Sequence, residues 1–291
     1  MLTDFICPDG EHTGILGCLV TCRMERRCLS LPTLRECART RPWTGSPSVT
    51  QLLNGTQMEF LKITVPYAIR PESRAFALLG TRHHERLAGG AIDDDTISEE
   101  LFEGDTYKGH PDYLEGTTLW DYKTWGSYRV TRFLGLVSEK IDDPTGAVYE
   151  KSGKWGRAGS IKQVNLWTRS PLMADTHEPT LQLNAYRLVV EQHGYPVESM
   201  RLQITVRDGG LQISRQRGVD KLIYVEDVER LEDVEVEEYF SEKAECLLRA
   251  LEFGNWHGPC TQDERWDDQR CREYCEVAFA CEHGKEVLAS V

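Results

Sequence analysis

Residues 107–124 read YKGHPDYLEGTTLWDYKT, which is two strand-like runs separated by Glu115-Gly116. A glycine after a polar residue is typical of a tight turn between two strands. The pattern predicts a β-hairpin with strands over Tyr107–Leu114 and Thr117–Thr124.

Three charged side chains of this hairpin are expected to converge. Asp121 and Lys123 are two residues apart on one strand, so they face the same side, and Asp112 lies on the partner strand. Magnesium prefers one or two carboxylates together with waters and phosphate oxygens, and a neighbouring lysine can orient the attacking water. Taken alone, the pattern also fits a surface hairpin with an ion pair.

The flanking sequence predicts a mixed α/β core. Ser48 is a plausible N-cap for the first helix, and Gly194 with Pro196 would close the third. The turn residues Asp208-Gly209-Gly210 predict a second hairpin. The order is helix, hairpin, helix, hairpin, helix. The further predicted helices and strands are helices over Val49–Lys62, Glu72–Leu87, Leu181–His193 and Leu231–Phe253, and strands over Arg201–Arg207, Leu211–Arg215 and Leu222–Val225.

Composition changes along the chain predict three parts. Residues 1–45 would form a small cysteine-rich module, and 46–225 the core. Residues 125–178, which are glycine-rich and polar with three tryptophans, would be an insertion in that core. Residues 226–291 would contain an acidic helix and a second cysteine-rich module.

Composition also excludes several classes of protein. The chain has 291 residues, 40% of them hydrophobic and 28% charged, and its mean hydropathy is −0.46. No apolar run approaches the length of a membrane helix, and residues 1–4 lack a signal-peptide pattern. We therefore expect a cytoplasmic protein with no membrane partner.

Charge is unevenly distributed. The formal net charge is −13, which argues against a passive nucleic-acid coat protein. Residues 226–245 contain ten acidic and two basic side chains, whereas residues 20–42 contain six arginines and two glutamates. Either run could be an ordinary solvated face, but a basic surface can coexist with a negative total charge.

The ten cysteines show a repeated spacing. Eight form two quartets with the same C-x10-C-x3-C-x5-C pattern: Cys7, Cys18, Cys22 and Cys28, and then Cys260, Cys271, Cys275 and Cys281. Four thiolates suit tetrahedral zinc or an iron–sulfur cluster, and closed sites of this kind can serve structure alone. The remaining Cys37 and Cys246 are expected to be buried apolar residues.

Four ordered motifs give the sequence a recognisable pattern. They are G-x3-H at Gly80 and His84, G-x2-D at Gly109 and Asp112, D-x-K at Asp121 and Lys123, and Q-x3-Y at Gln182 and Tyr186. Over residues 46–215 this set resembles the RecB-family branch of the PD-(D/E)xK nucleases. The resemblance implies a restriction-endonuclease-like core, a mixed central sheet flanked by helices, here with a four-cysteine metal module at each end.

The resemblance also implies roles for individual residues. His84, Asp112 and Asp121 would bind Mg²⁺ or Mn²⁺, with the Tyr122 carbonyl completing the shell. Lys123 would activate water. Gln182 and Tyr186 would position the DNA strand at the scissile phosphate. The neighbouring His83 would be a phosphate contact or a surface residue, and Glu85 a supporting group beside a ligand.

The C-terminal quartet extends the resemblance to iron-staple nucleases, namely the AddB nuclease domain and the CRISPR-associated adaptation exonucleases. Cys271, Cys275 and Cys281 are similar to the closely spaced triplet of those proteins. That family usually takes its fourth cysteine from upstream of the first motif, whereas here Cys260 completes a local quartet. The resemblance implies a 4Fe–4S cluster there and at the N-terminal quartet, and the departure from the family's pattern leaves Zn²⁺ as the alternative. His257 and His283 are near enough to replace a cysteine but are expected to be bystanders.

The leading hypothesis is a metal-dependent DNA nuclease, in particular an exonuclease on single strands or DNA ends, working in repair or recombination. DNA is the expected partner. The chain has no Walker A motif, so it is not itself an ATP-driven helicase. It could instead be the nuclease partner of a helicase or of a recombination or adaptation protein. Basic side chains would contact the DNA backbone and tryptophans of the insertion could stack on bases. The alternative is a non-catalytic nucleic-acid-binding or assembly module held by the two four-cysteine sites. A redox protein would leave the four motifs unexplained. The basic residues concerned are Arg82, Arg86, Lys151, Lys154, Arg157 and Lys162.

Overall fold

The computed structural model describes residues 1–91, 96–256 and 258–290, and it has a mixed α/β fold, as predicted. The chain divides into two compact units. Unit 1 comprises Met1–Asp121, Thr180–Arg201 and Asp227–Val291, and unit 2 comprises Tyr122–Pro179 and Leu202–Glu226. The three-part division expected from composition stays a prediction. No helix of the described residues has the length and apolar character needed to cross a membrane.

The N-terminal residues of unit 1 form a three-stranded sheet of order β2-β1-β3. β1 (Leu2–Ile6) pairs antiparallel with β2 (His12–Gly14) and parallel with β3 (Tyr67–Ile69). Two helices follow β2, α1 (Ile15–Val20) and α2 (Leu31–Ala38). Helix α1 ends at Val20, and the residues between α1 and α2 form turns and bends.

The first predicted helix is two helices. Ser48 caps α3 (Val49–Leu53) through a capping box with Gln51, and α4 (Thr56–Thr64) starts again after Asn54-Gly55. A β-carbon at Gly55 would lie 2.7 Å from the Cys260 sulfur, so the chain breaks where a distant cysteine approaches its backbone.

A five-stranded sheet of order β12-β11-β8-β7-β4 carries the predicted hairpin. β7 (Tyr113–Glu115) pairs antiparallel with β8 (Thr118–Trp125) and with β4 (Thr96–Ser98). The first strand of the hairpin is shorter than predicted because the segment before β7 instead forms β6 (Lys108–Gly109), which pairs with β5 (Phe102–Glu103).

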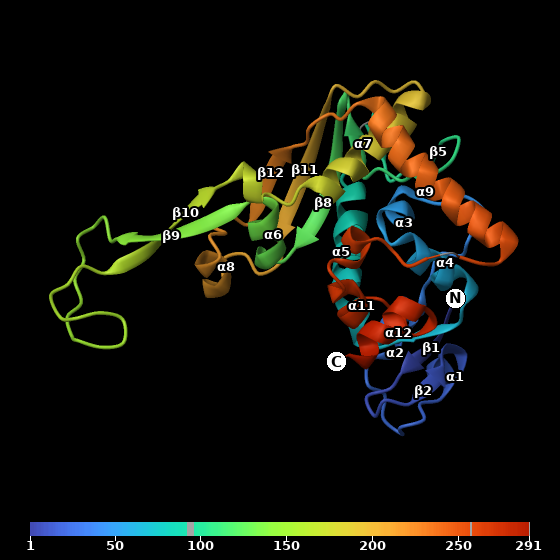
Figure 1. Ribbon diagram of the computed structural model, residues 1–291, viewed down its shortest axis with the longest axis horizontal. Helices are drawn as coiled ribbons and strands as arrows, with labels where there is room; N and C mark the ends of the chain where they lie inside the picture. Colours follow the sequence, from blue (N-terminus) through green and yellow to red (C-terminus); the bar gives the residue numbers. More distant parts are fainter. Residues whose placement is uncertain (92–95, 257, 291) are drawn as a thin grey trace. The chain divides into compact units, whose positions relative to one another are not determined.

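Three long helices of unit 1 follow the predictions closely. A 3₁₀ turn, η1 (Pro71–Arg74), leads into α5 (Ala75–Ala88). The helix α7 (His177–Gln192) ends just before Gly194, which has a φ of 87°. The acidic helix α9 (Asp233–Phe253) packs on α3 and α4, as Figure 1 shows, and Gly254 closes it in the left-handed conformation.

Helix α9 buries one stripe, which contains Val236, Phe240, Ala244 and Leu247. Cys246 lies outside that stripe and is exposed, so its predicted burial is wrong, whereas Cys37 is buried as predicted. The C-terminal module continues with α10 (Gln262–Arg265), α11 (Gln269–Glu273), η3 (Ala278–Ala280) and α12 (Glu282–Ala289).

Unit 2 contains α6 (Ser127–Phe133) and a long antiparallel hairpin of β9 (Leu136–Asp142) and β10 (Gln163–Arg169), followed by η2 (Pro171–Met173). In Figure 1 this hairpin projects beyond α6 and ends in a long loop. Most of β11 (Ser199–Val206) and β12 (Ile223–Asp227) also belongs to unit 2.

The second predicted hairpin is wrong in its return strand. Residues 212–216 form a helix, α8 (Gln212–Gln216), instead of a strand. Leu211 and Ile213, whose alternation suggested a strand, are both exposed. The Asp208 carboxylate accepts hydrogen bonds from the Ser127 backbone N–H and hydroxyl, so this turn is fixed by α6 and not by strand pairing.

Candidate functional site

The two predicted carboxylates lie at the end of the hairpin that is away from its turn. Asp121 is in β8, and Asp112 directly precedes β7 instead of lying in a strand as expected. Tyr113 of β7 is opposite Trp120 of β8, so Asp112 and Asp121 are each the next residue beyond the last paired position. Asp121 is only 1% exposed and Asp112 only 7%. Two carboxylates withdrawn from water in this way need a cation or donors to offset the cost of burial.

Helix α5 supplies the predicted histidine to this pair. The Nδ1 atom of His84 lies 3.0 Å from Asp112 Oδ1 and 3.5 Å from an oxygen of Glu99. The second Glu99 oxygen lies 3.0 Å from Nδ1 of His110. His84, Glu99 and Asp112 therefore form a chain of acid–imidazole contacts, with ligand atoms that all lie within 4.8 Å of one another.

Electrostatics couples this group to Asp121. Hydrogen bonds to Asp112 and then Glu99 raise the pKa of His84 to about 10, and the charge of Asp121 adds to the effect. Hydrogen bonds from His110 and then His84 lower the pKa of Glu99 to about 2. The imidazole is thus a protonated cation among carboxylates. A divalent cation would replace that proton, because a histidine ligand must be neutral.

Lys123 follows Asp121 at an interval of two on β8. This interval is the one that strand alternation assigns to a common face, and a role for Lys123 beside Asp121 stays a prediction. The division between the two units falls directly after Asp121, within this strand.

Gln182 and Tyr186 form a second cluster, one helical turn apart on α7. The Gln182 amide donates to the Tyr186 hydroxyl at 3.0 Å, and the Thr50 hydroxyl lies 3.5 Å from it. Tyr186 is only 5% exposed, so its ring is part of the core, and its expected role in positioning a DNA strand stays a prediction.

Gly109 explains how α7 approaches the hairpin. A β-carbon there would lie 2.6 Å from Val189 Cγ2 and 3.1 Å from Tyr186 Cδ1. The glycine of the G-x2-D motif is therefore required for close packing of α7, three residues before Asp112.

Glu99 and His110 were missed by the sequence interpretation. Glu99 is adjacent to Glu100 and follows a run of aspartates, so no spacing distinguishes it. Its backbone has a φ of 52°, uncommon for a residue with a side chain, and its N–H donates to the Asp112 carbonyl. Glu85, expected to support the ligands, instead pairs with Arg82 on the exposed side of α5.

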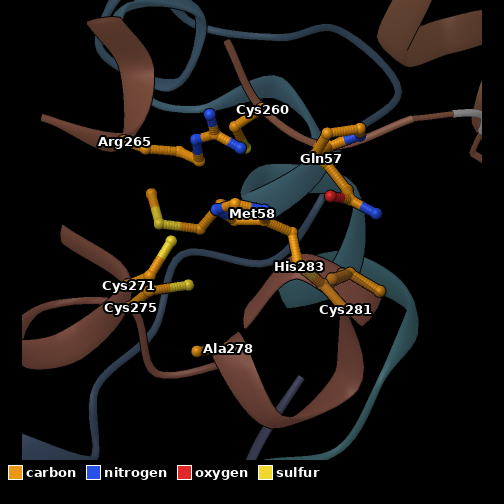
Figure 2. Close-up of a pocket in the computed structure, with 11 residues that line it drawn as sticks. Gln57, Met58, Cys260, Arg265, Cys271, Cys275, Ala278, Cys281 and His283 are labelled. Carbon is orange, nitrogen blue, oxygen red and sulfur yellow. The ribbon is translucent and has the colours of Figure 1, made fainter. Parts of the chain in front are cut away.

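The C-terminal cysteines line a single pocket. Figure 2 shows Cys260, Cys271, Cys275 and Cys281 around it, together with Met58 and His283. Burial raises the pKa of both Cys260 and Cys275 to about 11, so these thiols are neutral until a metal displaces their protons.

Backbone N–H groups offset part of the effect of burial on these thiols. Those of Met58 and Gln57 lower the pKa of Cys260, and that of Val277 lowers the pKa of Cys275. The Cys281 sulfur accepts from the Gly284 N–H at 3.1 Å and caps α12. A set of four sulfurs with amide donors fits a thiolate-bound metal centre, and backbone hydrogen bonds to sulfur are one way in which cluster potentials are set.

The candidate metal ligands of this pocket are not limited to the four thiols, because His283 also lines it. Its Nε2 atom lies 2.7 Å from Asp268 Oδ1, and this pair forms a compact trio with the sulfur of Cys271. A carboxylate, an imidazole and a thiolate are all ligands that zinc accepts, so the trio keeps zinc open as the alternative to a cluster. His257 lies outside the described residues.

The N-terminal quartet repeats the local structure of the C-terminal one. In each, the second cysteine lies on a short helix, α1 or α11, and the third follows two residues after that helix ends. The fourth precedes an eight-residue helix, α2 or α12. Burial and then the charges of Cys28, Cys7 and Cys22 raise the pKa of Cys18.

Comparison with known proteins adds little to this geometry. No protein-family model matches the sequence, and no curated protein matches it. The crystal structure of SSO0001 aligns over 87% of this chain and 93% of that one, at 14% identity and a TM-score of 0.43. A likeness of that size supports no conclusion about fold or function.

Proposed function

We propose that the chain is a Mg²⁺- or Mn²⁺-dependent deoxyribonuclease of the PD-(D/E)xK class, similar to the RecB family, which hydrolyses phosphodiester bonds in single strands or at DNA ends. The observation that carries the proposal is the convergence of His84, Glu99 and Asp112 within 4.8 Å, with buried Asp121 on the neighbouring strand. Three carboxylates and an imidazole suit a hard divalent cation that keeps sites for water and phosphate.

The chain's own residues have distinct roles in this proposal. His84, Asp112 and Asp121, with the Tyr122 carbonyl, would hold the cation, and Glu99 would add a ligand or fix the imidazole. A bound cation would polarise the phosphate and stabilise the charge on the leaving oxygen. Lys123 would orient the attacking water and assist its deprotonation.

Gln182 and Tyr186 have different roles in the proposal. Tyr186 packs in the core, and its hydroxyl accepts a hydrogen bond from the Gln182 amide at 3.0 Å, which orients the glutamine. Gln182 would then position the DNA strand. We also propose that both cysteine quartets hold 4Fe–4S clusters, with zinc as the alternative, and that they stabilise unit 1 and not the chemistry.

The first prediction is that Asp121→Asn and Lys123→Ala each slow cleavage of end-labelled DNA by at least about a hundredfold, because each loses a ligand or a proton-transfer group. Cleavage is followed by gel electrophoresis with Mg²⁺ or Mn²⁺. Glu115→Gln is the matched control, since Glu115 is an exposed carboxylate of the same hairpin, next to the turn.

Melting curves of each variant establish that the fold survives. Undiminished cleavage by both variants would reject the assignment. DNA binding by the wild type without any cleavage would instead support the non-catalytic binding module.

A further inference from the structure

Trp155 differs from the other six tryptophans of the chain in its exposure. It is 78% exposed, at the end of the loop that joins β9 to β10. The other two tryptophans of the expected insertion are packed in unit 2. Trp125 lies edge-on to Phe133, with ring centroids 5.3 Å apart, and the Trp167 ring lies against Gly218, where a β-carbon would be 2.5 Å from it.

The segment that presents Trp155 is hydrogen-bonded up to its end. Val148 and Ile161 form a β-bridge, and a second bridge joins Gly153 to Gly156. Only two residues, Lys154 and Trp155, lie between the bridged glycines, with N–H to carbonyl distances of 2.9 and 3.3 Å across the turn.

Tyr149 gives this turn further support. Its ring lies so close to Gly156 that a β-carbon there would be 2.3 Å from Tyr149 Cε2. The indole is therefore held out from a structured turn. A side chain that is already ordered loses less entropy when it binds, so the cost of association is small.

The charge of this loop is opposite to that of the chain. Residues 144–162 contain four basic side chains and one acidic side chain, a net of +3, whereas the chain as a whole has −13. Lys154 Nζ lies 5.5 Å from the Trp155 ring centre. Within the described part of the chain, no ion pair involves Lys151, Lys154 or Arg157.

We infer that this loop, the Trp155 turn, is a stacking site for an unpaired base of single-stranded DNA, with the neighbouring cations on its phosphates. Exposed aromatic rings together with basic side chains are what sequence-tolerant single-strand binding requires. A paired base in a duplex offers no free face, so the turn should discriminate single strands from duplex. The inference deepens the proposed nuclease function, on which it rests, by naming the form of DNA that is bound.

The test is direct binding of a fluorescently labelled oligothymidylate to the full chain in EDTA, so that no cleavage occurs. We expect Trp155→Ala to weaken binding about five- to a hundredfold, the range for loss of one stacked base. Trp155→Phe should keep most of the affinity, and duplex affinity should change little in either variant. Leu172→Ala is the matched control, because Leu172 is a 96% exposed apolar residue of the same unit.

The outcomes separate this inference from the nuclease proposal. Single-strand affinity unchanged in Trp155→Ala would overturn the stacking site and leave the nuclease assignment intact, and the turn would then be a candidate contact for a protein. Equal losses for duplex and single strand would also overturn it. Absence of both DNA binding and cleavage in the wild type would overturn both proposals.

Discussion

The imidazole of His84 lies between Asp112 and Glu99, and this position links its charge to folding. Its pKa in the folded chain is about 10, against 6.5 for an ordinary histidine. A raised pKa in the folded state gives stability that is fully present below about pH 6.5 and is lost as the pH rises through about 10. The contribution of Glu99 to stability depends on pH in the opposite sense. Because its pKa is lowered to about 2, this contribution is lost only as the pH falls toward that value.

We therefore expect the metal-free protein to be stabilised by His84 near pH 6.5 and not above pH 10. Urea unfolding of EDTA-treated protein at these two pH values should show His84→Gln less stable than wild type at pH 6.5, with the two converging at pH 10. His12→Gln, on the exposed strand β2, controls for loss of any histidine. An equal difference at both pH values would mean that the imidazole is not protonated in the folded protein.

At this scale the sequence predicts the candidate ligands that belong to a spacing pattern and misses Glu99, which belongs to none. Asp112 and Asp121 follow from strand alternation across a tight turn, and His84 from its distance to Gly80. Glu99 depends on a left-handed backbone after β4, which no local pattern indicates. Cys246 was expected to be buried from its residue type alone, although the apolar stripe of α9 excludes it.

Among the elements, hairpin β7–β8 and helix α7 depend on each other at Gly109. A methyl group at this position would meet Val189 and Tyr186 at 2.6 and 3.1 Å, in a buried contact with no space to accept it. Tyr186 in turn holds Gln182, so displacement of α7 should reach the residue proposed to position DNA.

Gly109→Ala is expected to destabilise the protein by about 1–3 kcal/mol, as overpacking of a core contact does. Gly17→Ala is the matched control, since no atom lies within 4 Å of a β-carbon at this α1 glycine. In a helix interior that change should be neutral or slightly stabilising. Equal effects of the two substitutions on urea unfolding would show that α7 does not require a glycine at position 109.

The elements that the sequence predicted incorrectly are those set by distant contacts. The break between α3 and α4 depends on Cys260, about two hundred positions away, and the turn before α8 depends on Ser127 of α6. Helices α5, α7 and α9 were predicted closely because apolar periodicity and the glycines that follow each helix both act locally.

At the scale of the whole molecule, the two cysteine modules stabilise one core. Residues from β1, α1 and α2, from α4, and from the C-terminal module belong to a single hydrophobic cluster. Cys18 is buried in that cluster, and Cys260, Cys275 and Cys281 pack against it. Ion pairs connect the C-terminal module to α9 and α4, Lys243 to Glu264 and Lys62 to Glu276, each at 3.0 Å. Loss of metal from either end should therefore weaken the same core.

Matching local structures at the two ends predict matching contents. Anaerobically purified protein should contain about eight iron atoms per chain, as two four-iron clusters, and absorb broadly near ~400 nm. Cys22→Ser and Cys275→Ser should each remove about half of the iron and lower the melting temperature, because each deletes one ligand of one quartet. Cys246→Ser, outside both quartets and exposed on α9, should change neither. Elemental analysis measures the metal content, and absorption spectra detect a cluster. Two zinc atoms per chain in a colourless protein would show that both quartets bind zinc instead of clusters. Unequal losses from the two serine variants would contradict the equivalence of the two modules.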